Sequence, residues 1–172
     1  MPQIRTDLSS PEALHLARNF GIGVVLNGTG PEGSLRRTEL DAGIPAIIYE
    51  AGGVHILQTE EIERGVVGVQ NVMRAMKMLP ARNDANTPKA TVYRKTRWLR
   101  APKGAAGMFL TAIKPGDEVK RGQELGEVVD PLSDKISKIA SPDDAVIIGM
   151  VVPTVVYTGD ALFHLGLEKQ QE

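Results

Sequence analysis

Glu50 is the residue of this sequence that is best placed to do chemistry. It follows the apolar run Pro45 to Tyr49 and is itself followed by Ala51-Gly52-Gly53. A short apolar run of this kind predicts a buried strand, and ligands of open α/β sheets bind outside the carboxyl ends of the strands. A carboxylate there can take a proton from a metal-bound water and pass it to a leaving amine. The alternative is a structural carboxylate that accepts hydrogen bonds from loop amides.

Two neighbouring arginines are candidates for substrate binding. Arg36 and Arg37 follow the glycine-rich stretch 27–33 and lie at the start of a predicted helix. A guanidinium group can bind a substrate carboxylate through two parallel hydrogen bonds. The alternative, for either residue taken alone, is a solvated arginine on a helix surface.

The residues that bind zinc in proteins are few and scattered. The histidines are His15, His55 and His164, no two of them have the spacing of a metal-binding pair, and cysteine is absent. A catalytic zinc site commonly takes three protein ligands, drawn from His, Asp and Glu. The sequence therefore predicts no metal site built from this chain alone.

The first 80 residues alternate helix and strand signals. Ser10-Pro11-Glu12 predicts the start of a helix, and Gly21 is suited to end it. Further predicted elements are a strand over 22–26, a helix over 35–42 capped by Ser34, a strand over 45–49, and a long helix capped by Thr59 with an apolar stripe of Ile62, Val66, Val69, Met73 and Met76. This pattern predicts an α/β domain with a mainly parallel sheet. Two strands are too few for such a layer, so we expect residues 1–80 to be the end of a larger domain.

Residues 81–90 are polar and predict a linker, and residues 91–172 predict a separate β module. Gly116-Asp117 and Gly159-Asp160 are turn signals that recur between short apolar runs. The predicted strands cover residues 91–99, 108–113, 124–129, 135–139, 145–149 and 161–165.

Two features of the β module permit a binding role in place of catalysis. The segment 115–146 is similar to lipoyl and biotinyl carrier domains, in which Lys135 would be the modified lysine, but Pro131-Leu132-Ser133 lengthens its hairpin. We therefore expect a hammerhead-like, barrel-like module that is not modified. Residues 87–104 carry six basic side chains and no acid, with Tyr93 and Trp98 among them, which suits single-stranded nucleic acid or a solvated sheet edge.

The overall composition narrows the range of partners. The formal net charge is −1, so no overall field favours nucleic acid or an anionic membrane. No apolar run approaches the roughly 20 residues that cross a bilayer, and residues 1–10 have no signal-peptide pattern. We expect a cytoplasmic protein that binds neither nucleic acid nor membrane.

Several stretches, taken together and in order, resemble one family over nearly the whole chain. These are GSLRRTELDAGIPAIIYEAGG (33–53), RGVVGVQNVMRAMKML (64–79), RWLRAPKGAAGMF (97–109), PGDEVKRGQELGEVVDP (115–131), ASPDDAVIIGM (140–150) and TGDALFHLG (158–166). They resemble the carboxyl-terminal part of the succinylglutamate desuccinylase/aspartoacylase family. That resemblance implies an α/β remnant of a zinc-carboxypeptidase-like domain, followed by the β module.

The resemblance also implies an activity. Members of the family are zinc-dependent hydrolases that cleave the amide, or sometimes ester, bond of small N-acyl amino acid-like substrates. Glu50 matches the family's proton-relaying glutamate, Arg36 and Arg37 lie near the position of a substrate-binding arginine, and Tyr157 is a candidate substrate contact from the β module. The family's zinc ligands, a His-x-x-Glu pair and a later histidine, match nothing in this chain.

Because the family's zinc ligands have no match in this chain, the isolated chain is expected to lack activity. We expect it to need an upstream segment or companion chain that carries the zinc ligands. Apolar surface left uncovered by missing strands predicts a homo-oligomer. The alternative function is a non-catalytic binding or carrier-like module built on the β half.

Overall fold

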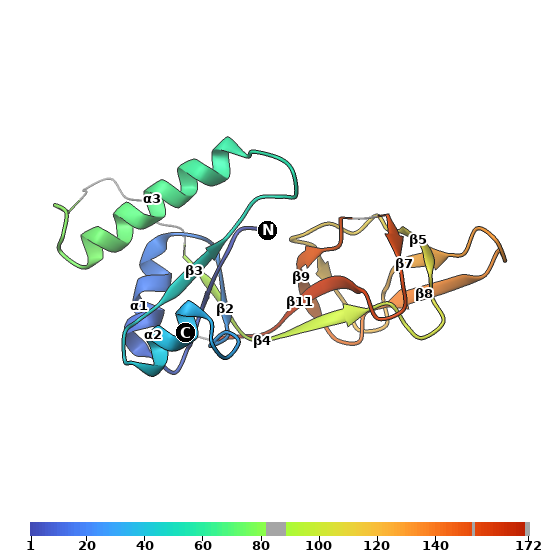
Figure 1. Ribbon diagram of the computed structural model, residues 1–172, viewed down its shortest axis with the longest axis horizontal. Helices are drawn as coiled ribbons and strands as arrows, with labels where there is room; N and C mark the ends of the chain where they lie inside the picture. Colours follow the sequence, from blue (N-terminus) through green and yellow to red (C-terminus); the bar gives the residue numbers. More distant parts are fainter. Residues whose placement is uncertain (82–88, 153, 171–172) are drawn as a thin grey trace. The chain divides into compact units, whose positions relative to one another are not determined.

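The computed structural model describes residues 1–81, 89–152 and 154–170, and it divides into two compact units. The α/β unit comprises Pro2–Arg94 and Lys169–Glu172, and the β unit comprises Met1 and Lys95–Glu168. Most of the predicted linker, residues 82–88, lies outside the described residues. Figure 1 shows the elements of both units.

The sheet of the α/β unit is mixed. Its strands, in the order β3-β1-β2-β4, are β3 (Ile47–Glu50), β1 (Gln3–Thr6), β2 (Val24–Asn27) and the first part of β4 (Thr91–Arg100). Strands β1, β2 and β4 are parallel, whereas β3 runs antiparallel to β1. The sequence predicted β2 and β3 in a mainly parallel sheet, did not identify β1, and assigned β4 to the β module alone. The prediction of a mainly parallel sheet was therefore wrong for β3. Because of this reversal, Glu50 lies opposite Gln3, at the end of the sheet away from the carboxyl ends of β1 and β2.

Local capping signals define the first two helices. In α1 (Pro11–Phe20), the Ser10 hydroxyl accepts a hydrogen bond from the Ala13 backbone N–H at 3.2 Å, and Gly21 ends the helix with a φ of 89°. Ser34 caps α2 (Leu35–Asp41) in the same way. The N-cap of the third helix, α3 (Thr59–Ala75), is Gln58 and not Thr59 as predicted, and the Gln58 side chain makes no capping hydrogen bond.

The core of this unit lies between the sheet and α1. Ile4, Phe20, Val25 and Val92 are buried there, and Val72 of α3 packs against them. Gly68 is the buried residue of α3, and it lies against the Phe20 ring. The predicted apolar stripe does not form the buried face of α3, because Ile62, Val66, Val69 and Met76 are exposed.

The β unit is built from short antiparallel strands, as the turn spacing predicts. One set follows the order β4-β11-β9-β6, with β11 (Ala161–Lys169), β9 (Ala145–Met150) and β6 (Glu118–Val119). The other follows β10-β5-β7-β8, with β10 (Val155–Val156), β5 (Gly107–Leu110), β7 (Glu124–Val129) and β8 (Ile136–Ala140). Phe109 and Phe163 meet edge to face in its core, with ring centroids 5.5 Å apart.

The α/β class of the chain, with mixed and antiparallel sheets and few helices, is thus confirmed. The hammerhead-like detail of the β unit stays a prediction. Among the described residues, no helix combines the length and apolarity that a membrane crossing requires.

Candidate active site

The two faces of the β3–β1 pair have different chemistry. Side chains alternate across a strand, so Ile4 and Tyr49 share one face while Gln3, Arg5 and Glu50 share the other. The first face belongs to the core, where the rings of Tyr49 and Phe20 lie 5.1 Å apart. The second face is polar, and we call Gln3, Arg5, Arg36 and Glu50 the polar cluster.

Glu50 is held in the polar cluster through one carboxylate oxygen. Gln3 Nε2 and Arg5 Nε each donate to Glu50 Oε2 at 2.8 Å. Among the described residues, no donor bonds to the other oxygen, Oε1. The Glu50 side chain keeps 42% of its surface exposed. This arrangement orients the carboxylate and leaves Oε1 open to a water molecule or a ligand.

Arg36 brings a second, unsatisfied group to the cluster. It is only 7% exposed, and within the described part of the chain its Nε and Nη1 have no hydrogen-bond partner. Burial lowers the pKa of the Arg36 guanidinium, the positive charge of Arg5 lowers it further, and Glu50 opposes both. Two buried guanidinium donors without partners are costly, and a bound carboxylate would satisfy them.

A glycine keeps the loop over Arg36 close. A Cβ atom at Gly30, whose φ is 90°, would lie 3.0 Å from Arg36 Nη2 and 3.2 Å from Nε. A glycine at position 30 therefore accommodates both the positive φ and the close approach of this loop to the guanidinium group, which a side chain there would have to displace slightly.

The other two candidate residues are not among the residues of the polar cluster. Arg37 lies on the outer surface of α2, where its Nε donates to both carboxylate oxygens of Asp41 at 2.8 Å. Tyr157 belongs to the β unit, is 65% exposed, and its backbone N–H donates to Asp160. Arg37 is therefore paired within its own helix, and the contact of Tyr157 with a substrate stays a prediction.

The residues that could bind a metal are also dispersed. His15 lies on α1, His55 in the loop after β3, and His164 in β11, stacked on Trp98. In the described ranges, no group of three or more His, Asp or Glu side chains could hold a metal ion. The described residues therefore do not fit a zinc site.

Lys135, the residue a carrier domain would modify, lies at the end of the β7–β8 turn. Its Nζ donates to the backbone oxygen of Gly104 at 2.9 Å. Two basic side chains of β4 form ion pairs within the protein, Arg97 with Asp143 and Lys95 with Glu168.

Sequence reasoning missed Gln3 and Arg5. The signal was the alternation Gln3-Ile4-Arg5-Thr6, which is typical of a strand with one apolar face, but at four residues β1 is too short to stand out. The partner of these two residues lies 45 or more positions away, and only the antiparallel pairing of β1 and β3 brings them together.

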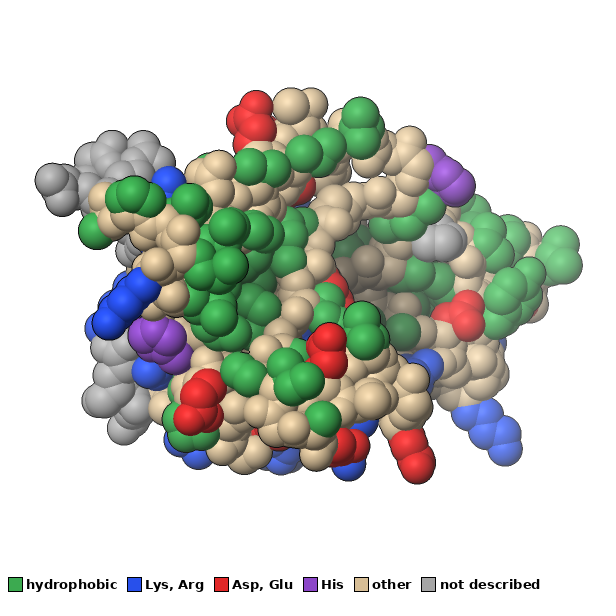
Figure 2. All heavy atoms as spheres, turned by 60° about the vertical axis from the view of Figure 1, so that its left-hand side comes forward, with side chains coloured by type: hydrophobic (Ala, Val, Ile, Leu, Met, Phe, Trp, Pro, Cys, Tyr) green, Lys and Arg blue, Asp and Glu red, His purple; other side chains and the backbone are tan. Residues whose placement is uncertain are grey.

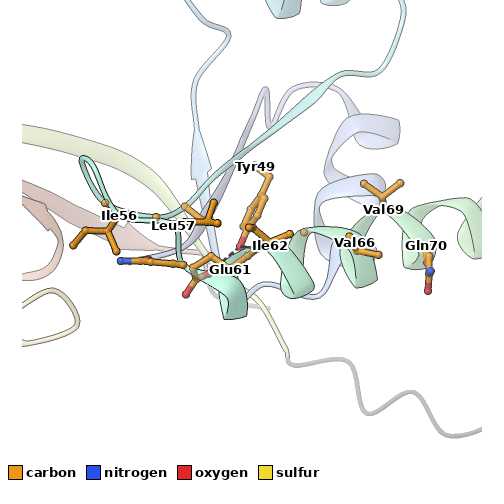
Figure 3. A pocket seen from close by; sticks show the side chains of 13 residues that line it. Tyr49, Ile56, Leu57, Glu61, Ile62, Val66, Val69 and Gln70 are labelled. Atoms are coloured by element: carbon orange, nitrogen blue, oxygen red, sulfur yellow. Dashed lines mark hydrogen bonds between the residues drawn. The ribbon is translucent and has the colours of Figure 1, made fainter.

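A hollow of about 650 Å³ lies on the opposite face of β3 from Glu50. It is lined mainly by apolar side chains of α3 and of the loop before it, together with Tyr49 (Figure 3). At its edge, the Tyr49 hydroxyl donates to Glu61 Oε2 at 2.9 Å and Arg64 donates to Glu61 Oε1, and the polar side chains of Gln58 and Gln70 also line it. This hollow is therefore distinct from the polar cluster.

The pKa of the Tyr49 phenol should be higher than that of an exposed tyrosine. Burial and the hydrogen bond to Glu61 raise its pKa to about 12. In the absorbance difference between the protein and Tyr49→Phe, we expect one phenol titrating near pH 12. Because the pKa is raised in the folded state, its contribution to stability is complete below about pH 10 and is lost as the pH rises toward 12. A phenol that titrates near pH 10 would contradict this contact.

Comparison with known proteins gives a fold and no sequence match. No family model and no curated protein sequence matches the chain. Among solved structures, the ectoine utilization protein EutE (DoeB) from Ruegeria pomeroyi has a TM-score of 0.83 at 14% identity, over 98% of this chain and 55% of that one. A succinylglutamatedesuccinylase/aspartoacylase from Rhodobacter sphaeroides also has a TM-score of 0.83, at 19% identity, over 98% and 53%.

A third solved structure extends the same pattern. A succinylglutamate desuccinylase from Silicibacter sp. TM1040 has a TM-score of 0.80 at 15% identity, over 99% of this chain and 54% of that one. The chain therefore spans about half the length of each solved protein it matches. The resemblance expected from the sequence is confirmed in the fold, which is that of about half of a succinylglutamate desuccinylase/aspartoacylase family protein.

Proposed function

We propose that this chain is the portion of a hydrolase that supplies the proton-relaying carboxylate and a carboxylate-binding arginine. The substrates would be small N-acyl amino acid-like molecules, cleaved at their amide or ester bond. The observation that carries the proposal is the polar cluster. Glu50 is anchored through Oε2 alone, beside the buried and unpaired donors of Arg36.

The cluster suits the two tasks of such a reaction. Arg36 would bind the carboxylate of the substrate, replacing the partners that its buried donors lack. Glu50 Oε1 would take a proton from the attacking water and deliver it to the nitrogen or oxygen that leaves. Gln3 and Arg5 would keep Oε2 occupied, so that the proton moves through the open oxygen.

Zinc enters this proposal only through residues outside the chain. The family resemblance implies a catalytic zinc ion, which would polarise the scissile carbonyl. Since the described residues do not fit a zinc site, the ligands would come from an upstream segment or a companion chain. We accordingly expect hydrolysis only when that segment is supplied.

Anion binding tests the proposal without any metal. We expect N-acetylglycine and succinate to bind the isolated chain weakly, with Arg36→Met weakening binding about tenfold or more, since hydrogen bonds to charged groups contribute about 1.5–3 kcal/mol. Isothermal titration calorimetry at low ionic strength is the measurement. Arg37→Met is the matched control, because it removes a neighbouring guanidinium that Asp41 already pairs.

Comparing anion binding by the two variants distinguishes a role of Arg36 from one of Arg37. Circular dichroism establishes that both variants are folded, and Arg36→Lys keeps the charge if Arg36→Met is unstable. Equal binding by Arg36→Met and the unaltered chain would remove Arg36 from the site.

A further inference from the structure

Helix α3 has two apolar sides, and the described residues cover one of them. The side with Gly68 and Val72 packs against α1 and the core. The other side carries Ile62, Val66 and Val69, which are 49%, 54% and 54% exposed. An exposed apolar row beside the buried one widens the apolar surface of α3 beyond what α1 and the sheet cover, and such a surface is typical of a helix that packs against a further element.

The uncovered side borders the hollow described above. Val66 and Val69 line it from α3, and Ile56 and Leu57, which are 65% and 84% exposed, line it from the preceding loop (Figure 3). We call this surface the α3 face. Figure 2, which turns the side of the α/β unit forward, shows hydrophobic side chains gathered in one area. The lining of the hollow is mainly apolar, and the carboxylate of Glu61 is bonded to Tyr49 and Arg64, so the α3 face suits apolar side chains better than a small anionic or cationic ligand.

The strand beside the α3 face has an unpaired edge. β3 pairs with β1 along one edge, and within the described ranges its other edge carries no strand. Such an edge presents backbone N–H and C=O groups that can pair with another strand. Tyr49 belongs to β3 and also lines the hollow, so the free edge and the α3 face adjoin.

We propose that the free edge of β3 and the α3 face together dock a polypeptide that continues the same α/β domain. It would add a strand alongside β3 and lay an apolar layer over Ile62, Val66 and Val69. Two observations favour this occupant. The solved proteins that share this fold are nearly twice as long as this chain. An added strand would also use the backbone edge, which an apolar ligand would leave unpaired.

The proposed function needs such a partner, so this inference names the surface on which it binds. The test reads out binding and not hydrolysis, so that either proposal can fail without the other. The probe is the part of the Rhodobacter sphaeroides protein that lies outside its match to this chain, produced as a separate tagged polypeptide and co-expressed with this chain.

A docked strand and a covered helix predict three results. The tagged probe and this chain co-purify as a one-to-one complex. Hydrogen exchange at residues 47–50 slows in the complex. The double variant Val66→Glu/Val69→Glu weakens binding at least tenfold, whereas Leu132→Glu does not, because Leu132 is 96% exposed on a turn of the β unit. Both altered valines are half-exposed, so the double variant is expected to fold.

Two results would overturn the inference. One is the absence of a complex with the probe while both polypeptides are folded. The other is a homodimer of this chain in sedimentation velocity that Val66→Glu/Val69→Glu dissociates, since a second copy would then be the occupant of the α3 face.

Discussion

Glu50→Gln is expected to lower the kcat for hydrolysis of an N-acylated amino acid by about 10²- to 10⁴-fold, the usual contribution of a positioned general acid–base group. The assay uses this chain together with the segment that supplies the zinc ligands, and it measures release of the free amine. Glutamine keeps the size of the side chain and its acceptor for Gln3 and Arg5, but it cannot take up the proton.

The KM of this variant should change much less than its kcat. Arg36, which is proposed to bind the substrate carboxylate, is unaltered, so ground-state binding is largely kept. Glu32→Gln is the matched control, because Glu32 is exposed and lies outside the polar cluster. If Glu50→Gln retained the kcat of the unaltered protein, Glu50 would have the structural role that its sequence position also permits.

The pair Gly68→Ala and Gly65→Ala should differ in stability by about 1–3 kcal/mol, the usual cost of overpacking a close contact. A Cβ at Gly68 would lie 2.0 Å from Phe20 Cε1, so α3 would have to move away from α1. A Cβ at Gly65 would lie 3.1 Å from Tyr49 Cε1, and a small shift of that ring suffices.

Both substitutions gain about 1 kcal/mol of helix propensity, so the comparison isolates the packing term. Urea unfolding followed by circular dichroism measures the difference, which is large beside a typical domain stability of 5–15 kcal/mol. Equal midpoints for the two variants would show that α3 does not pack on α1 through Gly68.

Features encoded in neighbouring residues were predictable from the sequence. The start of α1 follows from Ser10 and Pro11, and its end from Gly21, because a cap is a contact within one turn of the helix. Strand β7 was predicted at its observed bounds, 124–129, because turn residues flank it on both sides.

Features that depend on distant partners were not predictable. The direction of β3 is set by its pairing with β1, and nothing within residues 45–50 distinguishes a parallel from an antiparallel strand. The apolar spacing in α3 was recognised, but its covered side is chosen by the contact of Gly68 with Phe20, a residue of another helix.

The candidate site was likewise predictable only where it depends on neighbouring residues. The sequence points to both Arg36 and Arg37, which are adjacent and identical in chemistry. Their positions on α2 differ by about 100° of rotation, which buries Arg36 and leaves Arg37 to pair with Asp41. Which one meets Glu50 depends on how α2 packs, and that information lies outside the helix.

Chemical-shift mapping of the isotope-labelled chain with N-acetylglycine tests the location of the site most directly. The account predicts that shifts concentrate on the polar cluster and its loop, at residues 3–5, 30, 36 and 48–50. Shifts confined to the apolar hollow at residues 52–70, or to the β unit, would contradict it, because the ligand would then bind away from Glu50 and Arg36.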